Sequence, residues 1–155
     1  MLSKLLLGWW LMAMCVVIHA VGLTLAQRVL RRQPPPKAAR ASIWLLIILT
    51  GSIVLLHMME ITVWALFYVW QRALPDLQSS HYFSAVTYTT TGYGDLVLPE
   101  EWQLLGAVEA LTGTLMTGLS TGFFFAVVSR MFTAGAESCR PAARDVRPDR
   151  EKDGG

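Results

Sequence analysis

The chain is poor in charged residues. Only 15% of its 155 residues are Asp, Glu, Lys or Arg, while 54% are hydrophobic. Soluble domains ordinarily carry about 25% charged residues, so this shortage argues against a soluble domain and indicates lipid as the main solvent. Cysteine is equally scarce. Cys15 lies in an apolar stretch and Cys139 in a polar one, which argues against a disulfide. The sequence has no CxxC or paired Cys/His spacing typical of structural zinc.

What the chain has instead is three long apolar runs. Residues 5–26 contain no Asp, Glu, Lys or Arg and are long enough to cross a hydrocarbon core of about 30 Å. The second run, 42–70, is interrupted only by His57 and Glu60, and the third is 102–132. Tryptophans mark several ends of these runs, as is typical of membrane interfaces. The pattern predicts an all-α membrane protein with three transmembrane helices.

The segment 28–41 between the first two runs sets the predicted orientation. It has no acidic residue, and its basic residues are Arg28, Arg31, Arg32, Lys37 and Arg40. Such a loop is predicted to be cytoplasmic, and three consecutive prolines favour a stiff, extended connector. We therefore expect a multi-pass protein of the inner cell membrane, with its N-terminus outside and its C-terminus in the cytoplasm. The alternative is a signal peptide cleaved before Gln27, but 22 apolar residues exceed the usual length of about 7–15.

Residues 71–101, between the second and third runs, carry a further structural signal. Aromatic and apolar residues at helical spacing predict a short helix over about 79–89, with serines at its start suited to capping. A helix too short to span the membrane is expected to enter it and return, surrounded by protein or water. By contrast, the tail 133–155 mixes both signs of charge without an apolar period and is predicted to be disordered.

The stretch Thr89-Thr90-Thr91-Gly92-Tyr93-Gly94-Asp95 follows this short helix. Glycine adopts left-handed backbone angles at little cost, so alternating glycines allow successive carbonyl groups to face one side. A row of carbonyl oxygens can replace the hydration shell of a cation. The C-terminal end of the preceding helix, which carries partial negative charge, also favours a cation.

This stretch resembles the selectivity filter of potassium channels, and residues 42–132 resemble the small bacterial two-transmembrane pore module. The resemblance implies an outer helix 42–70, a pore helix about 79–89, a filter 90–94 and an inner helix 102–132. The extra helix in 1–27 and the linker 28–41 lie outside it. It also implies a homotetramer in the lipid bilayer that conducts K⁺, with K⁺ bound at Thr90, Thr91, Gly92 and Tyr93, and with Gly94 completing the filter.

Two departures from that family concern the support of the filter. Thr91 stands where relatives usually have Val or Ile, which places a new hydroxyl behind the filter. Phe83 and Val86 occupy positions where relatives place a Trp or a Glu, and neither side chain can donate a hydrogen bond to Asp95. The inactivation behaviour of relatives is therefore not carried over.

Two further groups of residues are candidates for a role. His57, Glu60 and Glu109 are predicted to form a polar cluster behind the pore helix, because acids at membrane depth are costly and often functional. Their alternative interpretation is a set of separately satisfied hydrogen bonds. Gly113 and Gly118 lie among small residues on one face of the third helix and are candidate hinges, or simply sites of close helix packing.

The sequence leaves other functions open but less favoured. A less selective cation channel and a non-conducting partner subunit are the alternatives to a potassium channel. "GLSTG" at 118–122 matches a serine-hydrolase pattern but lacks the preceding strand that this motif requires, so no enzyme is expected. We expect no cofactor apart from the permeant K⁺, no nucleic acid partner and no small-molecule substrate. The gating stimulus has no sequence signal: the first helix lacks the arginines of a voltage sensor.

Overall fold

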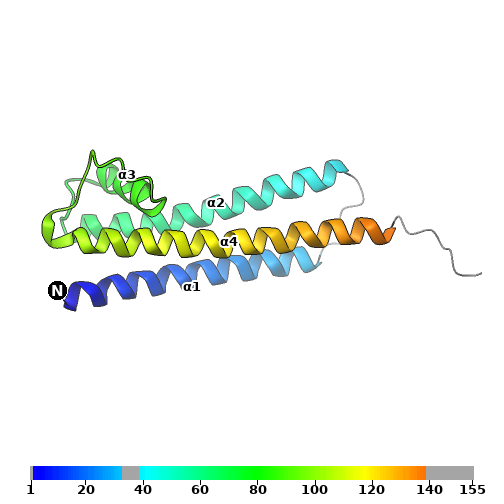
Figure 1. Cartoon of the computed structure of the whole chain (residues 1–155), viewed down its shortest axis with the longest axis horizontal. Coiled ribbons are helices and arrows are strands. Elements are labelled where there is room, and N and C mark those ends of the chain that lie inside the picture. Colours follow the sequence, from blue (N-terminus) through cyan, green and yellow to red (C-terminus); the bar gives the residue numbers. More distant parts are fainter. Residues whose placement is uncertain (1, 33–38, 139–155) are drawn as a thin grey trace, which may run out of the picture.

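Three long helices lie side by side, and a short fourth helix packs at one end of them (Figure 1). The computed structural model describes residues 2–32 and 39–138. The long helices are α1 (Leu2–Arg32), α2 (Ala39–Trp70) and α4 (Gln103–Ser138). The short helix is α3 (Leu77–Tyr88), and a 3-10 turn, η1 (Glu100–Trp102), leads into α4. The described residues contain no strand, which confirms the predicted all-helical class.

The three long helices have the length and composition of membrane spans. Apolar segments Leu2–Arg32, Arg40–Trp70 and Glu100–Met131 are each long enough to cross a bilayer. Many large apolar side chains on them face outward from the chain, among them Trp10, Ile48, Leu55, Leu111 and Phe125. A surface of this kind is stable against lipid and would be an aggregation hazard in water. This confirms the prediction of three helices able to span a membrane.

Helix α1 packs along the bundle through one narrow stripe. Its buried residues Gly8, Leu11, Cys15 and His19 recur at steps of three or four, which places them on one helical face. This face packs against α4 and α2. At the start of α1, Lys4 pairs with Glu101 at 3.0 Å and lies 4.1 Å from the centre of the Trp102 ring. The N-terminus of α1 therefore lies at the same end of the molecule as α3 (Figure 1).

Several predicted helix ends are wrong by a few residues. Helix α1 continues through Arg32, well into the predicted linker, and α2 begins at Ala39 instead of 42. Arg31 and Arg32 lie in the last turn of α1, where positive charge stabilises a helix. Helix α4 continues through Ser138, so helix replaces disorder at the start of the predicted tail. The three linker prolines and residues 139–155 lie outside the described residues.

The short helix begins two residues earlier than predicted because another residue caps it. The N-cap of α3 is Asp76, whose carboxylate accepts from the backbone N–H of Ser79 at 2.8 Å. The Ser79 hydroxyl, expected to be a cap, donates to the same carboxylate at 3.0 Å. These hydrogen bonds lower the pKa of Asp76 below its usual value. The cap therefore fixes the residue at which α3 begins.

Candidate functional site

Helix α3 is held against α2 by one face of buried residues. These are Ser80, Phe83, Ser84 and Tyr88. Phe83 packs edge-on against Tyr68 of α2, with ring centres 5.4 Å apart. His81 lies 3.1 Å from the hydroxyl of Thr62, also on α2. Small serines and a large aromatic residue on the same face let α3 approach the long helices closely, which positions the segment that follows it.

A regular helix-ending motif closes α3. The N–H of Thr91 donates to the carbonyl of Val86, and the N–H of Thr90 donates to the carbonyl of Thr87, both at 2.9 Å. This pair of bonds is the Schellman arrangement, in which the residue after the cap has a left-handed backbone. That residue is Thr90, with φ 59°. Left-handed angles are rare and strained for a β-branched residue, so the surrounding hydrogen bonds hold Thr90 in place.

Left-handed backbone then recurs at every second residue. Positive φ occurs at Thr90 (59°), Gly92 (56°) and Gly94 (77°), and not at Thr91 or Tyr93. All five residues are exposed in the single chain, and Tyr93 has 71% of its surface open. The alternation that the two glycines suggested is therefore present in the backbone, and it begins one step earlier, at the threonine that caps α3.

The hydroxyl of Thr91 has a partner on the cap of α3. It lies 2.9 Å from the hydroxyl of Thr89, which donates in turn to the carbonyl of Ala85 at 2.7 Å. Thr91 therefore donates to Thr89. The hydroxyl that Thr91 has in place of Val or Ile therefore adds a bond between the segment 90–94 and the end of α3.

Asp95 accepts a hydrogen bond from a residue that the sequence analysis missed. The Tyr82 hydroxyl donates to Asp95 Oδ2 at 2.6 Å. This bond favours the ionised carboxylate and lowers the pKa of Asp95, while it raises the pKa of Tyr82. Phe83 and Val86 make no bond to Asp95, as expected. The hydrogen bond that these two residues cannot supply comes instead from Tyr82, the residue before Phe83. A phenol one position earlier in the helix was the available signal.

Gly113 is a site of close approach between α4 and α3. A Cβ at this position would collide with the carbonyl of Tyr88, the last residue of α3. Gly118, the other predicted hinge, has open space where its Cβ would lie. Helix α4 runs without interruption through both positions. Gly113 therefore serves packing in this structure, because only glycine allows the end of α3 to lie so close.

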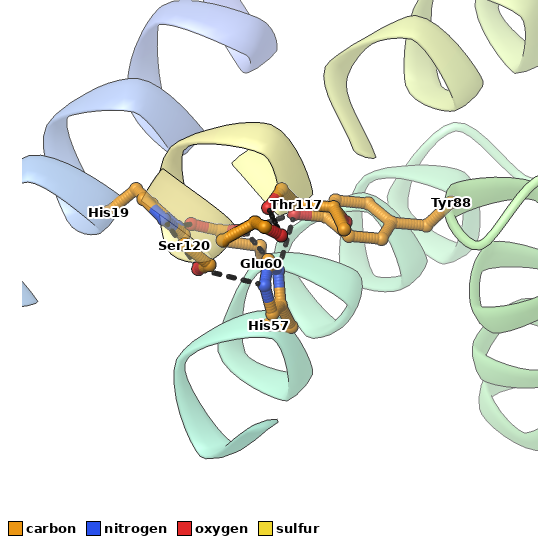
Figure 2. Close-up of polar contacts among 7 residues, drawn as sticks. His19, His57, Glu60, Tyr88, Thr117 and Ser120 are labelled. Atoms are coloured by element: carbon orange, nitrogen blue, oxygen red, sulfur yellow. Dashed lines mark hydrogen bonds and ion pairs between the residues drawn. The ribbon is translucent and has the colours of Figure 1, made fainter. Parts of the chain in front are cut away.

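Glu60 and His57 come together, but within a different cluster from the predicted one (Figure 2). His19 Nδ1 lies 2.8 Å from Glu60 Oε1, and the Tyr88 hydroxyl donates to Glu60 Oε2. His57 Nδ1 lies 3.1 Å from the Tyr88 hydroxyl. The Ser120 hydroxyl lies 3.1 Å from His19 Nε2 and 3.2 Å from His57 Nε2. The five residues form a closed ring, called the polar ring below.

Glu109 is not part of the polar ring. It is fully buried on α4, and the Tyr68 hydroxyl donates to its Oε2 at 2.8 Å. The predicted single cluster is thus wrong in this member: Glu109 bonds to Tyr68 of α2, whereas Glu60 bonds to His19 of α1 and Tyr88 of α3. His19, Tyr88 and Ser120 were not predicted as members, because their approach depends on how α1, α3 and α4 pack, and sequence spacing within one helix does not reveal that.

The polar ring resembles a metal site and a hydrolase catalytic triad, but its geometry supports neither. His19, His57 and Glu60 each offer one atom within 4.8 Å of the others, close enough for a metal ion. However, the nitrogen and oxygen atoms of these three side chains already bond to one another, to Ser120 or to Tyr88. A metal ion would therefore have to displace the protons of these hydrogen bonds. Ser120, His19 and Glu60 also follow the contact order of a hydrolase triad. Ser120 is buried in the middle of α4, whose N–H groups bond within the helix and form no oxyanion hole.

Together these features define a class: an all-helical membrane protein whose short, packed helix ends in an exposed segment of alternating backbone handedness. A protein-family model described as "ion channel" matches residues 43–130, which is more than half of the chain. The chain belongs to this ion channel family. Helix α1 lies outside the matched residues, whereas α3, the segment 90–95 and most of α4 lie within them. Neither a curated protein nor a solved structure matches the chain.

Proposed function

We propose that the chain is a potassium-selective channel and that residues 90–94 line its selectivity filter. The observation that carries the proposal is the positive φ at Thr90, Gly92 and Gly94. Alternate left-handed residues turn successive carbonyl groups toward the same side, whereas a regular strand alternates them. Rings of such carbonyls replace the hydration shell of K⁺ in the filters of potassium channels. Thr90, Thr91, Gly92 and Tyr93 would supply the oxygens for K⁺.

The surroundings of this segment favour a cation. Helix α3 ends immediately before it, and the C-terminal end of a helix carries partial negative charge. Asp95 follows it as an ionised carboxylate, because the Tyr82 hydroxyl stabilises that form. Both charges attract K⁺ and repel anions, so they support cation conduction; discrimination between K⁺ and Na⁺ rests on the carbonyl rings.

A filter of this kind needs more than one chain. Four loops surround the ion in potassium-channel filters, and one chain supplies one loop. The segment 90–95 is exposed, and Tyr93 is open over 71% of its surface. We therefore propose a homotetramer in which Tyr93 packs against a neighbouring copy. Cross-linking of the purified protein in lipid nanodiscs tests this directly: a ladder that ends at four chains is expected, and one that ends at two would contradict it.

The arrangement of charges supports an orientation in the cell membrane with the filter outside. Lys4 and Glu101 pair at the end of the bundle that holds α3, while Arg28, Arg31 and Arg32 lie at the opposite end of α1. By the positive-inside rule the arginine end faces the cytoplasm. The N-terminus of α1 and the filter would then share the outer side. A retained α1 is also favoured over a cleaved signal peptide, because His19 is a member of the polar ring.

The experiment that tests the function is ion flux into liposomes that contain the purified chain. We expect K⁺ flux that exceeds Na⁺ flux, and loss of this preference in Gly92→Ala, whose left-handed angle disfavours a side chain. Equal flux of both ions would support a less selective cation channel. Absence of flux in both directions across a range of pH would support a non-conducting subunit, and either result would overturn the proposal.

A further inference from the structure

The polar ring joins all four helices through one closed circuit (Figure 2). His19 comes from α1, His57 and Glu60 from α2, Tyr88 from α3 and Ser120 from α4. The circuit runs from Glu60 to His19, Ser120, His57, Tyr88 and back to Glu60. It uses both nitrogens of each imidazole and both oxygens of the carboxylate. Four members are almost fully buried, and only His57 is partly open.

A count of protons shows what the circuit requires. Each of the five contacts of the circuit joins two atoms that can share one hydrogen, so five protons close the ring. His57 Nδ1 also lies 3.4 Å from Glu60 Oε2, but this contact uses the same Nδ1 hydrogen and adds no proton to the count. A neutral imidazole, a serine hydroxyl and a phenol each supply one proton, and a carboxylate supplies none. With Glu60 ionised and both histidines neutral, the ring has four. One contact would then join two acceptors, so the closed ring holds one additional proton, whichever atom carries it.

The charge of the ring leads to the same state. With four protons the ring carries one negative charge at membrane depth, and with five it is neutral. Uncompensated charge at such depth is costly, and the ion pairs of Glu60 among the described residues are with His19 and His57 alone. A sixth proton would place two donors against each other and make the ring positive. Hydrogen bonding and charge therefore both select the five-proton ring.

The ring bears directly on the end of α3. Tyr88 is the last residue of this helix and is followed by the cap Thr89 and by left-handed Thr90. The Tyr88 hydroxyl is fixed by the ring, while its carbonyl lies against Gly113 of α4. The hydroxyl and the carbonyl of Tyr88 are thus both held in place, immediately before the segment 90–94. A change in the hydrogen bonds of the ring would therefore alter the position of Tyr88 and of Thr90, the first residue of the segment.

We propose that the polar ring is a proton-dependent clasp that positions the end of α3, with His19 as the contribution of α1, and that it makes K⁺ conduction depend on pH. The inference rests on the proposed function for its effect on conduction but not for the clasp itself. Among the described residues, Cys15 on α1 and Glu109 on α4 lie within electrostatic range of the ring, and Tyr68 on α2 bonds to Glu109; none of them lies in the circuit.

The wild-type protein should therefore lose stability and K⁺ flux on both sides of an optimum pH. On the alkaline side the ring loses its fifth proton, and on the acidic side it gains a sixth. Two readouts are needed: the thermal unfolding midpoint of the protein in detergent, and K⁺ flux in liposomes, each as a function of pH. The first does not depend on conduction, so it separates failure of the clasp from failure of the channel proposal.

Glu60→Gln is the decisive variant because glutamine supplies the missing proton permanently. Its amide nitrogen donates to the Tyr88 hydroxyl oxygen and its carbonyl accepts from His19, which closes the ring with both histidines neutral. We expect stability and flux near those of the wild type at the optimum pH, the alkaline loss abolished and the acidic loss retained. A purely structural carboxylate would give either an unchanged pH profile or a loss at every pH.

Two more variants keep the test informative if Glu60→Gln folds poorly. His19→Phe opens the ring and leaves two buried groups, Glu60 and Ser120, each without one partner. It should therefore reduce flux at the optimum by at least about tenfold, since even one buried polar group left unpaired has an effect of that order. Glu109→Gln changes the other buried acid and should keep the alkaline loss at its wild-type pH.

An alkaline loss that persists in Glu60→Gln, or that disappears in Glu109→Gln, would overturn the proposal. A pH-independent unfolding midpoint in the wild type would also overturn it, whereas a bell-shaped midpoint without flux would leave the clasp standing and remove the channel proposal.

Discussion

The segment 90–95 and the polar ring both lie at the end of α3. They differ in whether the contacts within a single chain satisfy and bury their polar groups. The ring is closed: five residues from four helices satisfy one another, and Glu60 and His19 have no exposed surface. The segment is open: its residues are exposed, and added Cβ atoms at Gly92 and Gly94 would meet nothing within 4 Å. One chain therefore completes the support by itself, whereas the proposed filter would be completed by further copies of the chain.

The largest effect is expected where the open segment loses its backbone freedom. Gly92→Ala places a side chain on a left-handed residue, at a cost of about 1–3 kcal/mol for such a strained backbone. We expect the ratio of K⁺ to Na⁺ flux to fall by at least about tenfold while the helices stay folded. Gly51→Ala is the matched control, since an added Cβ there also meets nothing within 4 Å and its φ is not left-handed. Equal effects of the two substitutions would contradict the distinction.

The junction between the two regions gives the next largest effect. Gly113→Ala forces the end of α3 away from α4, because the new Cβ would overlap the Tyr88 carbonyl. Overpacking of this kind costs about 1–3 kcal/mol, so we expect a lower unfolding midpoint together with reduced flux. Gly118→Ala, on the same helix with open space around it, should not lower the midpoint, because alanine inside a helix is favoured over glycine by about 0.5–1 kcal/mol. A result in which Gly118→Ala is the more damaging would favour a hinge over close packing.

Tyr82→Phe tests a bond at the outer end of the open segment. The Tyr82 hydroxyl lowers the pKa of Asp95, so the bond is present above that pKa and is lost as the pH falls through it. Without the hydroxyl, the pKa of Asp95 should rise toward its usual value. The pH at which infrared spectroscopy detects protonation of Asp95 should therefore move upward, with Asp95→Asn to identify the band. An unchanged midpoint would show that Tyr82 does not stabilise the carboxylate.

The smallest effect is expected farthest from both regions, at the start of α3. Asp76→Ala removes the cap, and the first turn of α3 should fray, which hydrogen exchange of its amide groups would report as faster exchange. Asp76→Ser retains a capping oxygen and should restore slow exchange. Because the other end of α3 is held by the polar ring and Gly113, ion selectivity should not change in either variant. A loss of selectivity in Asp76→Ala would mean that the polar ring and Gly113 do not fix the end of α3.

The sequence was sufficient for the features that depend on local pattern. Apolar length gave three helices able to span a membrane, and the two glycines predicted the alternation of backbone handedness that the structure has at 92 and 94. Helix ends were less accurate, since Asp76 outcompetes two nearby serines as the cap and the arginines after 27 continue α1. Residues of the polar ring other than His57 and Glu60 were not predictable, because Ser120 and His19 meet only through helix packing.

We propose that the exposed segment 90–94 becomes a potassium filter when four chains assemble. This claim can be tested by the reversal potential of currents through the purified protein in a planar bilayer, with K⁺ on one side and Na⁺ on the other. A K⁺ filter predicts a reversal potential displaced far toward the equilibrium potential of K⁺, and Gly92→Ala should bring it near zero. A wild-type reversal potential near zero would contradict the claim.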